Sequence, residues 1–172
     1  MPVREIVLLG DPILRESARE VEAFDEELKV LVRDMFETMV AAEGAGLAAP
    51  QVGVPLRVFV ADVRDEDGEG IRRFALVNPR IVSAADEEDR AAEGCLSIPG
   101  VSEVVSRPSA VVVEAFDPEG RPVRVEAEGI LARVLQHELD HLDGVLFIDR
   151  ISALKRRMVL KKYRKLREKE EG

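Results

Sequence analysis

The sequence contains one cysteine, two histidines, two glutamines and one asparagine among 172 residues. A single cysteine cannot form an intramolecular disulfide, which is typical of proteins in a reducing cytoplasm, so Cys95 is free for packing, metal binding or nucleophilic chemistry. No apolar run approaches the roughly eighteen residues that a membrane span requires. We therefore expect a soluble, cytoplasmic protein without a membrane segment.

The length and the 46% content of hydrophobic residues fit one compact domain with a buried core. Charge is divided unevenly along it, because residues 150–172 carry ten Lys or Arg against three Glu, whereas residues 1–149 carry 15 basic and 31 acidic residues. We predict a single domain over residues 1–172, with an acidic body over 1–150 and a basic helix over about 152–169. The acidic body argues against nucleic-acid binding over the whole surface, but the basic tail permits it at one place.

Residue periodicity predicts a mixture of helices and strands. Apolar residues at spacings of three and four predict a helix from Asp25, which can cap it, to about Glu43, with Gly44 at its end. Glycine and proline predict a loop over 44–55. A second helix is expected from Gly129 to Leu142. The expected strands are 57–63, 74–82, 109–116 and 121–129, the last two joined by the turn DPEG. Because strands and helices do not alternate regularly, we predict the α+β class.

Both histidines lie in the stretch QHELDHLDG, four residues apart on the second predicted helix. Positions i and i+4 share one face of a helix, so His137 and His141 can hold one metal ion. Glu138 lies about 100° further around the helix, where a base acting on metal-bound water is expected. The alternative is a chance occurrence of this pattern on an amphipathic helix.

A catalytic metal of this kind takes three protein ligands and one open position. Neither pattern of the zinc proteases is completed here, since Phe147 stands where one class has a third histidine and the late glutamates lie in the basic tail. Cys95 is the remaining candidate. A free cysteine is usually a small buried apolar residue, but Glu93 and Gly94 beside it are unusual for a purely apolar strand. A nucleophilic cysteine is a second alternative, although it would leave Glu138 without a role.

Three stretches of the sequence, GAGLAAPQ (44–51), EGCLS (93–97) and QHELDHLDG (136–144), resemble the three signature motifs of peptide deformylase in order and spacing. DPILR and VNPRI also resemble the family, so the similarity covers the body to about Ile151. Both histidines, the only cysteine and both glutamines fall inside these motifs. The resemblance implies short, mainly antiparallel sheets packed around a central helix that carries HExxH, followed by a C-terminal helix.

The resemblance implies hydrolysis of the formyl group from the N-terminal formylmethionine of new polypeptides, with release of formate. Cys95, His137 and His141 would hold one divalent ion, with metal-bound hydroxide as the nucleophile and Glu138 as general base and acid. Family likeness favours Fe²⁺ in vivo, with Zn²⁺, Ni²⁺ or Co²⁺ possible in purified protein.

The resemblance also assigns residues that bind the substrate. The oxyanion would be held by the metal, the Gln51 side-chain amide and the Leu96 backbone N–H, although Gln51 alone would pass for a surface amide. The peptide would lie extended near Gly46 and the segment after Cys95. The expected substrate-binding residues are Gly44, Ala45, Gly46, Glu93, Gly94, Ile130, Arg133 and Val134. Ala45 and Arg133 depart from the larger aliphatic residues common in relatives, and Gly44 and Gly46 alone would equally indicate a helix stop.

The expected partners are N-formylmethionyl nascent peptides, and the protein is expected to act as a monomer. The basic helix either packs on the body or docks on ribosomal RNA near the exit tunnel. Two rival functions remain: a peptidase that cuts internal amide bonds, and a ribosome-binding module with a structural metal. The second would need a fourth protein ligand; no further histidine or cysteine exists, which leaves an Asp or Glu carboxylate as the remaining choice.

Overall fold

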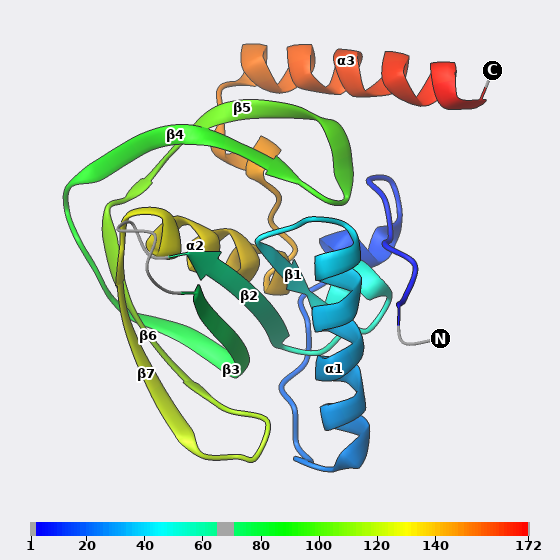
Figure 1. Cartoon of the computed structure of the whole chain (residues 1–172). Helices are drawn as coiled ribbons and strands as arrows, with labels where there is room; N and C mark the ends of the chain where they lie inside the picture. The colour runs from blue at the N-terminus through cyan, green and yellow to red at the C-terminus, as the bar shows by residue number, and fades with distance from the viewer. Residues whose placement is uncertain (1–2, 65–70, 172) are drawn as a thin grey trace.

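The computed structural model describes residues 3–64 and 71–171, which form α-helices, short 3-10 helices (η) and β-strands (Figure 1). In chain order these are η1 (Pro12–Arg15), α1 (Glu26–Ala41), β1 (Gly46–Ala48), η2 (Ala49–Val52), β2 (Val58–Arg64), β3 (Ile71–Ala84), β4 (Glu88–Cys95), β5 (Ile98–Pro108), β6 (Ala110–Phe116), β7 (Pro122–Glu128), α2 (Gly129–Leu142), η3 (Phe147–Arg150) and α3 (Ala153–Glu171). The predicted α+β class is confirmed.

The strands form two antiparallel sheets, one of five strands in the order β1-β2-β3-β6-β7 and one of two strands, β4 and β5. Within the larger sheet, β2 is buried on both faces. In β2, Val58 and Val60 pack with the apolar face of α1, whereas Phe59 and Ala61 pack with that of α2. Because successive side chains of a strand point to opposite faces, one strand contributes to two cores. The helix α2 lies between the larger sheet and the β4–β5 sheet (Figure 1).

The predicted first helix is confirmed as α1, and its start is set by the expected cap. Asp25 has extended backbone angles, and its Oδ1 accepts a hydrogen bond from Leu28 N at 3.1 Å. The helix ends at Ala41, two residues before the predicted end. Glu43 adopts the left-handed conformation (φ 58°), so a non-glycine residue, and not Gly44, reverses the chain.

Two strand predictions need correction. The predicted loop over 44–55 contains β1, which is too short to show an alternating pattern. The pair β4 and β5 was not predicted at all. Between Glu88 and Gly94 of β4, Glu93 is the only buried residue, so no apolar alternation marks this strand. The hairpin predicted over 109–129 is confirmed as β6 and β7, which pair from Ala110–Glu128 to Phe116–Pro122.

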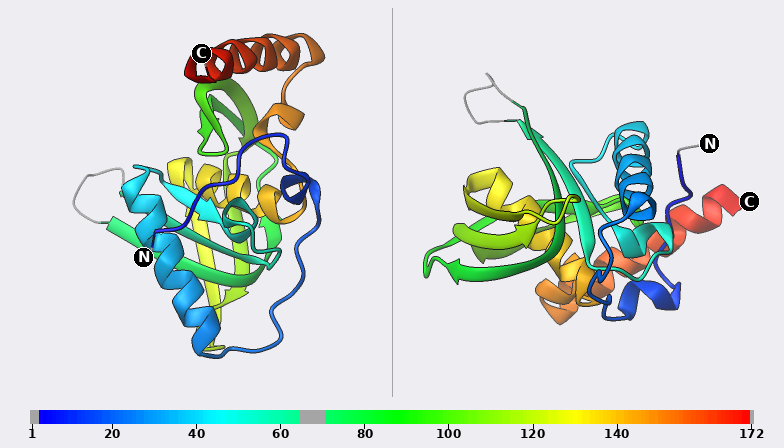
Figure 2. Two further views of the ribbon diagram at one scale, coloured as in Figure 1. Left: turned by 90° about the vertical axis from the view of Figure 1, so that its right-hand side faces the viewer. Right: turned by 90° about the horizontal axis from the view of Figure 1, so that it is seen from below.

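The C-terminal helix α3 lies across the β4–β5 sheet at one end of the molecule (Figure 2). The apolar residues of α3 lie on two faces of the helix. Val159 and Tyr163 are buried against β5 and η3, and Leu166 is partly buried there, whereas Leu154 and Met158 are each 61% exposed. Within the described ranges, no helix is both long and apolar enough to cross a bilayer.

Candidate metal centre

The helix α2 directs His137 and His141 away from the core of the five-stranded sheet, and Glu138 toward its edge strand β1. Leu135, Leu139 and other apolar residues of α2 are buried in the core between the helix and the five-stranded sheet, which fixes the rotation of the helix. The end of β4 then brings Cys95 to the two histidines. Its Sγ lies 3.4 Å from His141 Nε2, and this nitrogen lies 3.3 Å from His137 Nε2.

These three atoms have the spacing of ligands that share one ion. All three lie within 4.8 Å of one another. A tetrahedral ion at ordinary bond lengths would hold two nitrogens about 3.3 Å apart, and a sulfur and a nitrogen about 3.6 Å apart. The observed separations agree with both values. Thiolate and imidazole donors together suit a borderline divalent cation such as Zn²⁺ or Fe²⁺.

A buried carboxylate orients the first histidine. Burial by itself raises the pKa of Glu93, but hydrogen bonds from His137 and Arg107 outweigh it and hold the pKa at about 2. Glu93 is therefore an acceptor at neutral pH, so His137 Nδ1 donates to its Oε1 at 2.9 Å. This tautomer leaves the lone pair of His137 Nε2 directed away from Glu93 and available to a metal.

The charges around the histidines favour a cation between them. Burial lowers the pKa of His137, yet the neighbouring Cys95, Glu93 and Glu138 raise it to about 10. For His141, burial and the charge of His137 hold the pKa well below its usual value. The site therefore favours positive charge beside His137, but it disfavours protonation of both histidine rings. A metal dication shared by the two rings would meet both conditions.

The side chain of Glu138 lies against Gly46 of β1, where only a glycine leaves room for the carboxylate. A Cβ atom at Gly46 would approach Glu138 Oε2 to 2.6 Å. Glu138 is 4% exposed, and this burial raises its pKa to about 7. Its Oε1 is buried without a hydrogen-bond partner among the described residues. A carboxyl group with this pKa can accept and return a proton near neutral pH.

Gln51 on η2 is held with its amide nitrogen toward the cysteine. Its Oε1 accepts from Ala48 N at 2.9 Å, which directs Nε2 to Ser97 Oγ at 3.0 Å and toward Cys95 Sγ at 3.6 Å. Gln51 is therefore a buried, oriented donor and not a surface amide. Leu96 follows Cys95 and packs against Gly44, where a Cβ atom would approach Leu96 Cδ1 to 2.7 Å.

A cavity of about 520 Å³ opens beside these groups. Of the expected substrate-binding residues, the structure leaves Ile130 out of the cavity, because this residue lies in the first turn of α2 and is 60% exposed. His141 is buried and also does not line the cavity. Ala92 and Val101 line it although the sequence did not indicate them, since β4 and β5 carry no clear strand pattern. The expected residues that do line it are Gly44, Ala45, Gly46, Gln51, Glu93, Gly94, Cys95, Leu96, Arg133, Val134, His137 and Glu138.

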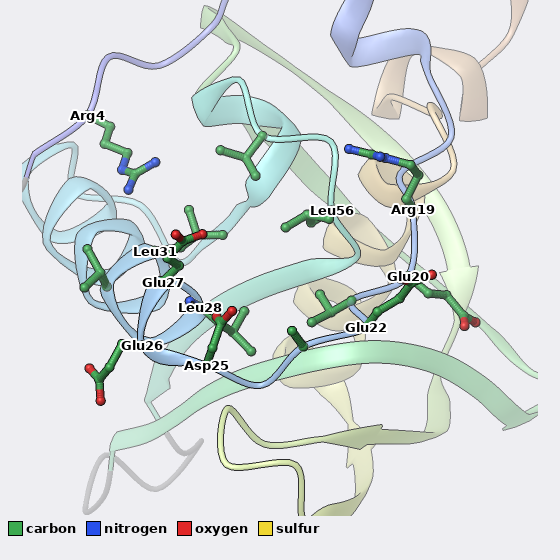
Figure 3. Close-up of a pocket in the computed structure, with 14 residues that line it drawn as sticks. Arg4, Arg19, Glu20, Glu22, Asp25, Glu26, Glu27, Leu28, Leu31 and Leu56 are labelled. Atoms are coloured by element: carbon green, nitrogen blue, oxygen red, sulfur yellow. Dashed lines mark hydrogen bonds between the residues drawn. The ribbon is translucent and has the colours of Figure 1, made fainter.

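A larger cavity, of about 700 Å³, lies elsewhere, between the start of α1 and the segments 19–25 and 54–56 (Figure 3). Its floor is apolar, with Leu28, Leu31 and Leu56, and carboxylates such as Glu20 and Glu27 stand at its rim. None of its lining residues is a histidine, cysteine or glutamine, so it lacks the thiolate and imidazole ligands and the amide donor that the smaller cavity brings together. The smaller cavity is therefore the candidate site.

Arg107 on β5 braces Glu93 through two hydrogen bonds, of 2.6 Å to Oε2 and 2.8 Å to Oε1. The side chains of this pair are 4% and 5% exposed. Replacing Arg107 with methionine is expected to lower the free energy of unfolding by about 3–5 kcal/mol, because the buried carboxylate loses its main partner. Urea unfolding of the metal-free protein would measure this change. The double variant Glu93→Leu with Arg107→Met should lose less than the sum of the single variants, and additive losses would contradict the brace.

Comparison with known proteins points to one family. The family model for polypeptide deformylase matches residues 3–157. The chain is 50% identical over 166 residues to the peptide deformylase of Brucella suis biovar 1 (96% of this chain, 94% of the relative). It is 48% identical over 165 residues to that of Rhizobium meliloti, with coverage of 96% and 94%.

Solved structures agree with this similarity. A peptide deformylase from Legionella pneumophila superposes with a TM-score of 0.89 at 46% identity, covering 98% of this chain and 97% of the other. The peptide deformylase from Ehrlichia chaffeensis in complex with actinonin gives a TM-score of 0.89 at 41% identity, with coverage of 96% and 98%.

Proposed function

The chain belongs to the polypeptide deformylase family, and we propose that the cavity beside Cys95 is where it carries out the family's reaction. It is a metal-binding hydrolase that removes the formyl group from an N-terminal formylmethionine and releases formate. The observation that carries the assignment of the site is the approach of Cys95 Sγ to the two Nε2 atoms of His137 and His141, next to a buried carboxylate.

Cys95, His137 and His141 would hold the metal through one sulfur and two nitrogens. A divalent ion held in this way lowers the pKa of a bound water toward neutrality and polarises the formyl oxygen. The working ion is Fe²⁺, and Zn²⁺, Ni²⁺ or Co²⁺ occupy the same donors in purified protein. Glu93 keeps His137 in the tautomer that presents Nε2.

Glu138 moves the protons of the reaction. Its Oε1, which has no other partner among the described residues, accepts a proton from the attacking water and returns it to the departing amine. The burial that raises its pKa to about 7 matches both halves of this task, since the group is neither a fixed anion nor a fixed acid at neutral pH. Gly46 permits the close approach of β1 that keeps this carboxylate in place.

Gln51 and Leu96 stabilise the negative charge that develops on the formyl oxygen. Replacing Gln51 with alanine is expected to lower turnover on the order of a hundredfold or more, because one preorganised donor is lost. Formate release at saturating peptide measures the loss. Metal content should stay unchanged, since Gln51 is not a ligand. A turnover within about twofold of wild type would remove Gln51 from the mechanism.

The peptide lies extended along the free edge of β1. This strand is the outermost of the five-stranded sheet and pairs only with β2. Pairing of main chain with main chain makes the requirements beyond the first residue weak. The methionine side chain enters the cavity lined by Ala92, Val101, Val134 and the stem of Arg133. We propose a single domain over 1–172 that acts as a monomer in the cytoplasm.

The test of this function is formate release from formyl-Met-Ala-Ser by anaerobically purified protein. The rival peptidase function predicts instead cleavage of a longer unformylated peptide. Cleavage of the unformylated peptide, without formate release from the formylated one, would refute the proposed function.

The outer face of α3 docks on ribosomal RNA, and its inner face packs on the body. Val159 and Tyr163 are buried against β5 and η3, so deleting the helix would expose the core beneath it. A more selective variant than the deletion replaces the exposed residues Lys161, Lys162 and Lys165 with glutamate, which reverses their charge and leaves the packed face of α3 intact. We expect it to reduce co-sedimentation with ribosomes at low salt and to flatten the salt dependence of binding.

The control variant replaces the exposed residues Arg33, Arg80 and Arg124 with glutamate, so that the same charge change is made outside α3. It should co-sediment nearly as well as wild type. If the α3 variant and the control bind equally well, α3 has only a packing role.

A further inference from the structure

Arg133 lies on α2, one turn before His137 and on the same face. Its side chain lines the cavity but is only 13% exposed. Nη1 donates to Glu93 Oε2 at 2.5 Å and to Val105 O at 2.9 Å, and Nη2 donates to Asp89 O at 2.9 Å. The guanidinium group therefore links α2 to both strands of the β4–β5 sheet, as well as to the carboxylate that orients His137.

The Glu93 carboxylate is saturated as an acceptor only because of Arg133. A carboxylate has about four lone-pair positions. Oε1 accepts from Arg107 Nη2 and His137 Nδ1, and Oε2 accepts from Arg107 Nε and Arg133 Nη1. An aliphatic residue at 133 would leave one of these positions on a buried anion unfilled.

The two helical donors, Arg133 and His137, tie Glu93 directly to α2, whereas Arg107 reaches this helix only through another residue, donating from Nη1 to Asp140 Oδ2 at 2.9 Å. Arg107 ties Glu93 to β5, within the sheet to which Glu93 itself belongs. Arg133 and His137 tie it to α2 at two points four residues apart. Without Arg133, the only hydrogen bond between Glu93 and α2 among the described residues is the one to His137 itself. Glu93 would then contact α2 directly through His137 alone, while the two hydrogen bonds from Arg107 would still hold the carboxylate against β5.

We propose that Arg133 is a positioning residue for the metal ligand His137, acting through Glu93. The proposal rests on the proposed function, since it assigns His137 to the metal. A simple cross-link between α2 and the β4–β5 sheet would affect only the stability of the fold. A positioning role for Arg133 would in addition affect metal affinity. Loss of a direct hydrogen-bond partner of a metal-bound histidine typically lowers metal affinity by about 10- to 100-fold. Arg133 contacts that partner and not the histidine, so we expect its loss to lower metal affinity by roughly 3- to 10-fold.

The test compares wild type, Arg133→Leu and Arg133→Lys. Leucine keeps an aliphatic wall for the cavity, and lysine keeps the charge but cannot reach three acceptors together. Apo protein is titrated with Co²⁺ alone against a competing chelator, and the absorption bands of the bound Co²⁺ are recorded. We expect Co²⁺ affinity to fall roughly 3- to 10-fold in Arg133→Leu, with shifted bands, and by a smaller factor in Arg133→Lys.

Kinetics with saturating metal should show a lower kcat for Arg133→Leu with KM for formyl-Met-Ala-Ser little changed. The exposed Arg124→Leu, which removes an ion pair to Glu114, is the matched control and should keep the wild-type Co²⁺ affinity.

A folded Arg133→Leu with wild-type affinity and spectrum would overturn the proposal, even if its Tm falls. If Arg133→Leu does not fold, Arg133→Lys decides by the same criterion. Absence of formate release by wild type would instead refute the proposed function, because Co²⁺ affinity is measured without turnover.

Discussion

Replacing Glu138 with alanine is expected to lower formate release on the order of 10³- to 10⁴-fold while the protein retains its metal. General acid–base catalysis by one side chain typically contributes up to about 10⁴-fold. Glu138 is assigned both proton transfers, so its loss should lie near this upper limit, equivalent to about 4–5.5 kcal/mol of barrier. The buried, unpartnered Oε1 and the pKa of about 7 are the structural reasons for this assignment.

Single-turnover and steady-state formate release, together with metal analysis, would measure this effect. Glu138→Gln keeps the shape of the side chain but not its basicity, so it should be nearly as inactive as Glu138→Ala. Glu126→Ala, an exposed glutamate on β7, is the control and should keep wild-type activity. If Glu138→Gln kept more than about a tenth of the wild-type rate, proton transfer by this residue would be disproved.

Replacing Cys95 with serine is expected to abolish stable metal binding and to lower turnover by at least roughly 10³-fold. A serine hydroxyl is a much poorer ligand than a thiolate for a borderline divalent ion, and the two imidazoles alone leave the ion weakly held. Without a bound ion, the pKa of the attacking water would rise well above neutrality, toward that of bulk water. Metal content after dialysis against a chelator would report the first effect, and formate release the second.

Chelation of the wild type provides the matching experiment without a mutation. Metal-free protein should be inactive, unfold at a lower temperature than the loaded form and regain activity on anaerobic addition of Fe²⁺. Reconstitution with Zn²⁺ should restore less activity if Fe²⁺ is the working ion. Full activity in Cys95→Ser, with one ion still bound per chain, would exclude Cys95 as a ligand.

The sequence identified the chemistry because rare residue types gathered in three motifs. Both histidines, the only cysteine and both glutamines lie in them. The i, i+4 spacing on a helix guarantees that His137 and His141 are neighbours, whatever surrounds them. For α1, α2 and the β6–β7 hairpin, one buried face or a tight turn leaves a local pattern, and these elements were predicted nearly to their bounds.

The remaining features depend on contacts between distant segments. β4 has no local signal because Glu93 is its only buried residue before Cys95, and that burial exists only where Arg107, Arg133 and His137 meet it. In the same way, periodicity on α3 could not show that Val159 turns inward and Met158 outward, because the position of β5 decides which face is covered.

The sequence by itself thus predicted which side chains carry the chemistry and determined which of them share one helix. The tertiary structure decided how far apart the sulfur and the imidazole nitrogens lie, which tautomer His137 adopts and which residues line the cavity. The physical reason is that spacing within a helix is fixed by local backbone geometry, whereas the distance from Cys95 to His141 is set by the packing of β4 and β5 against α2.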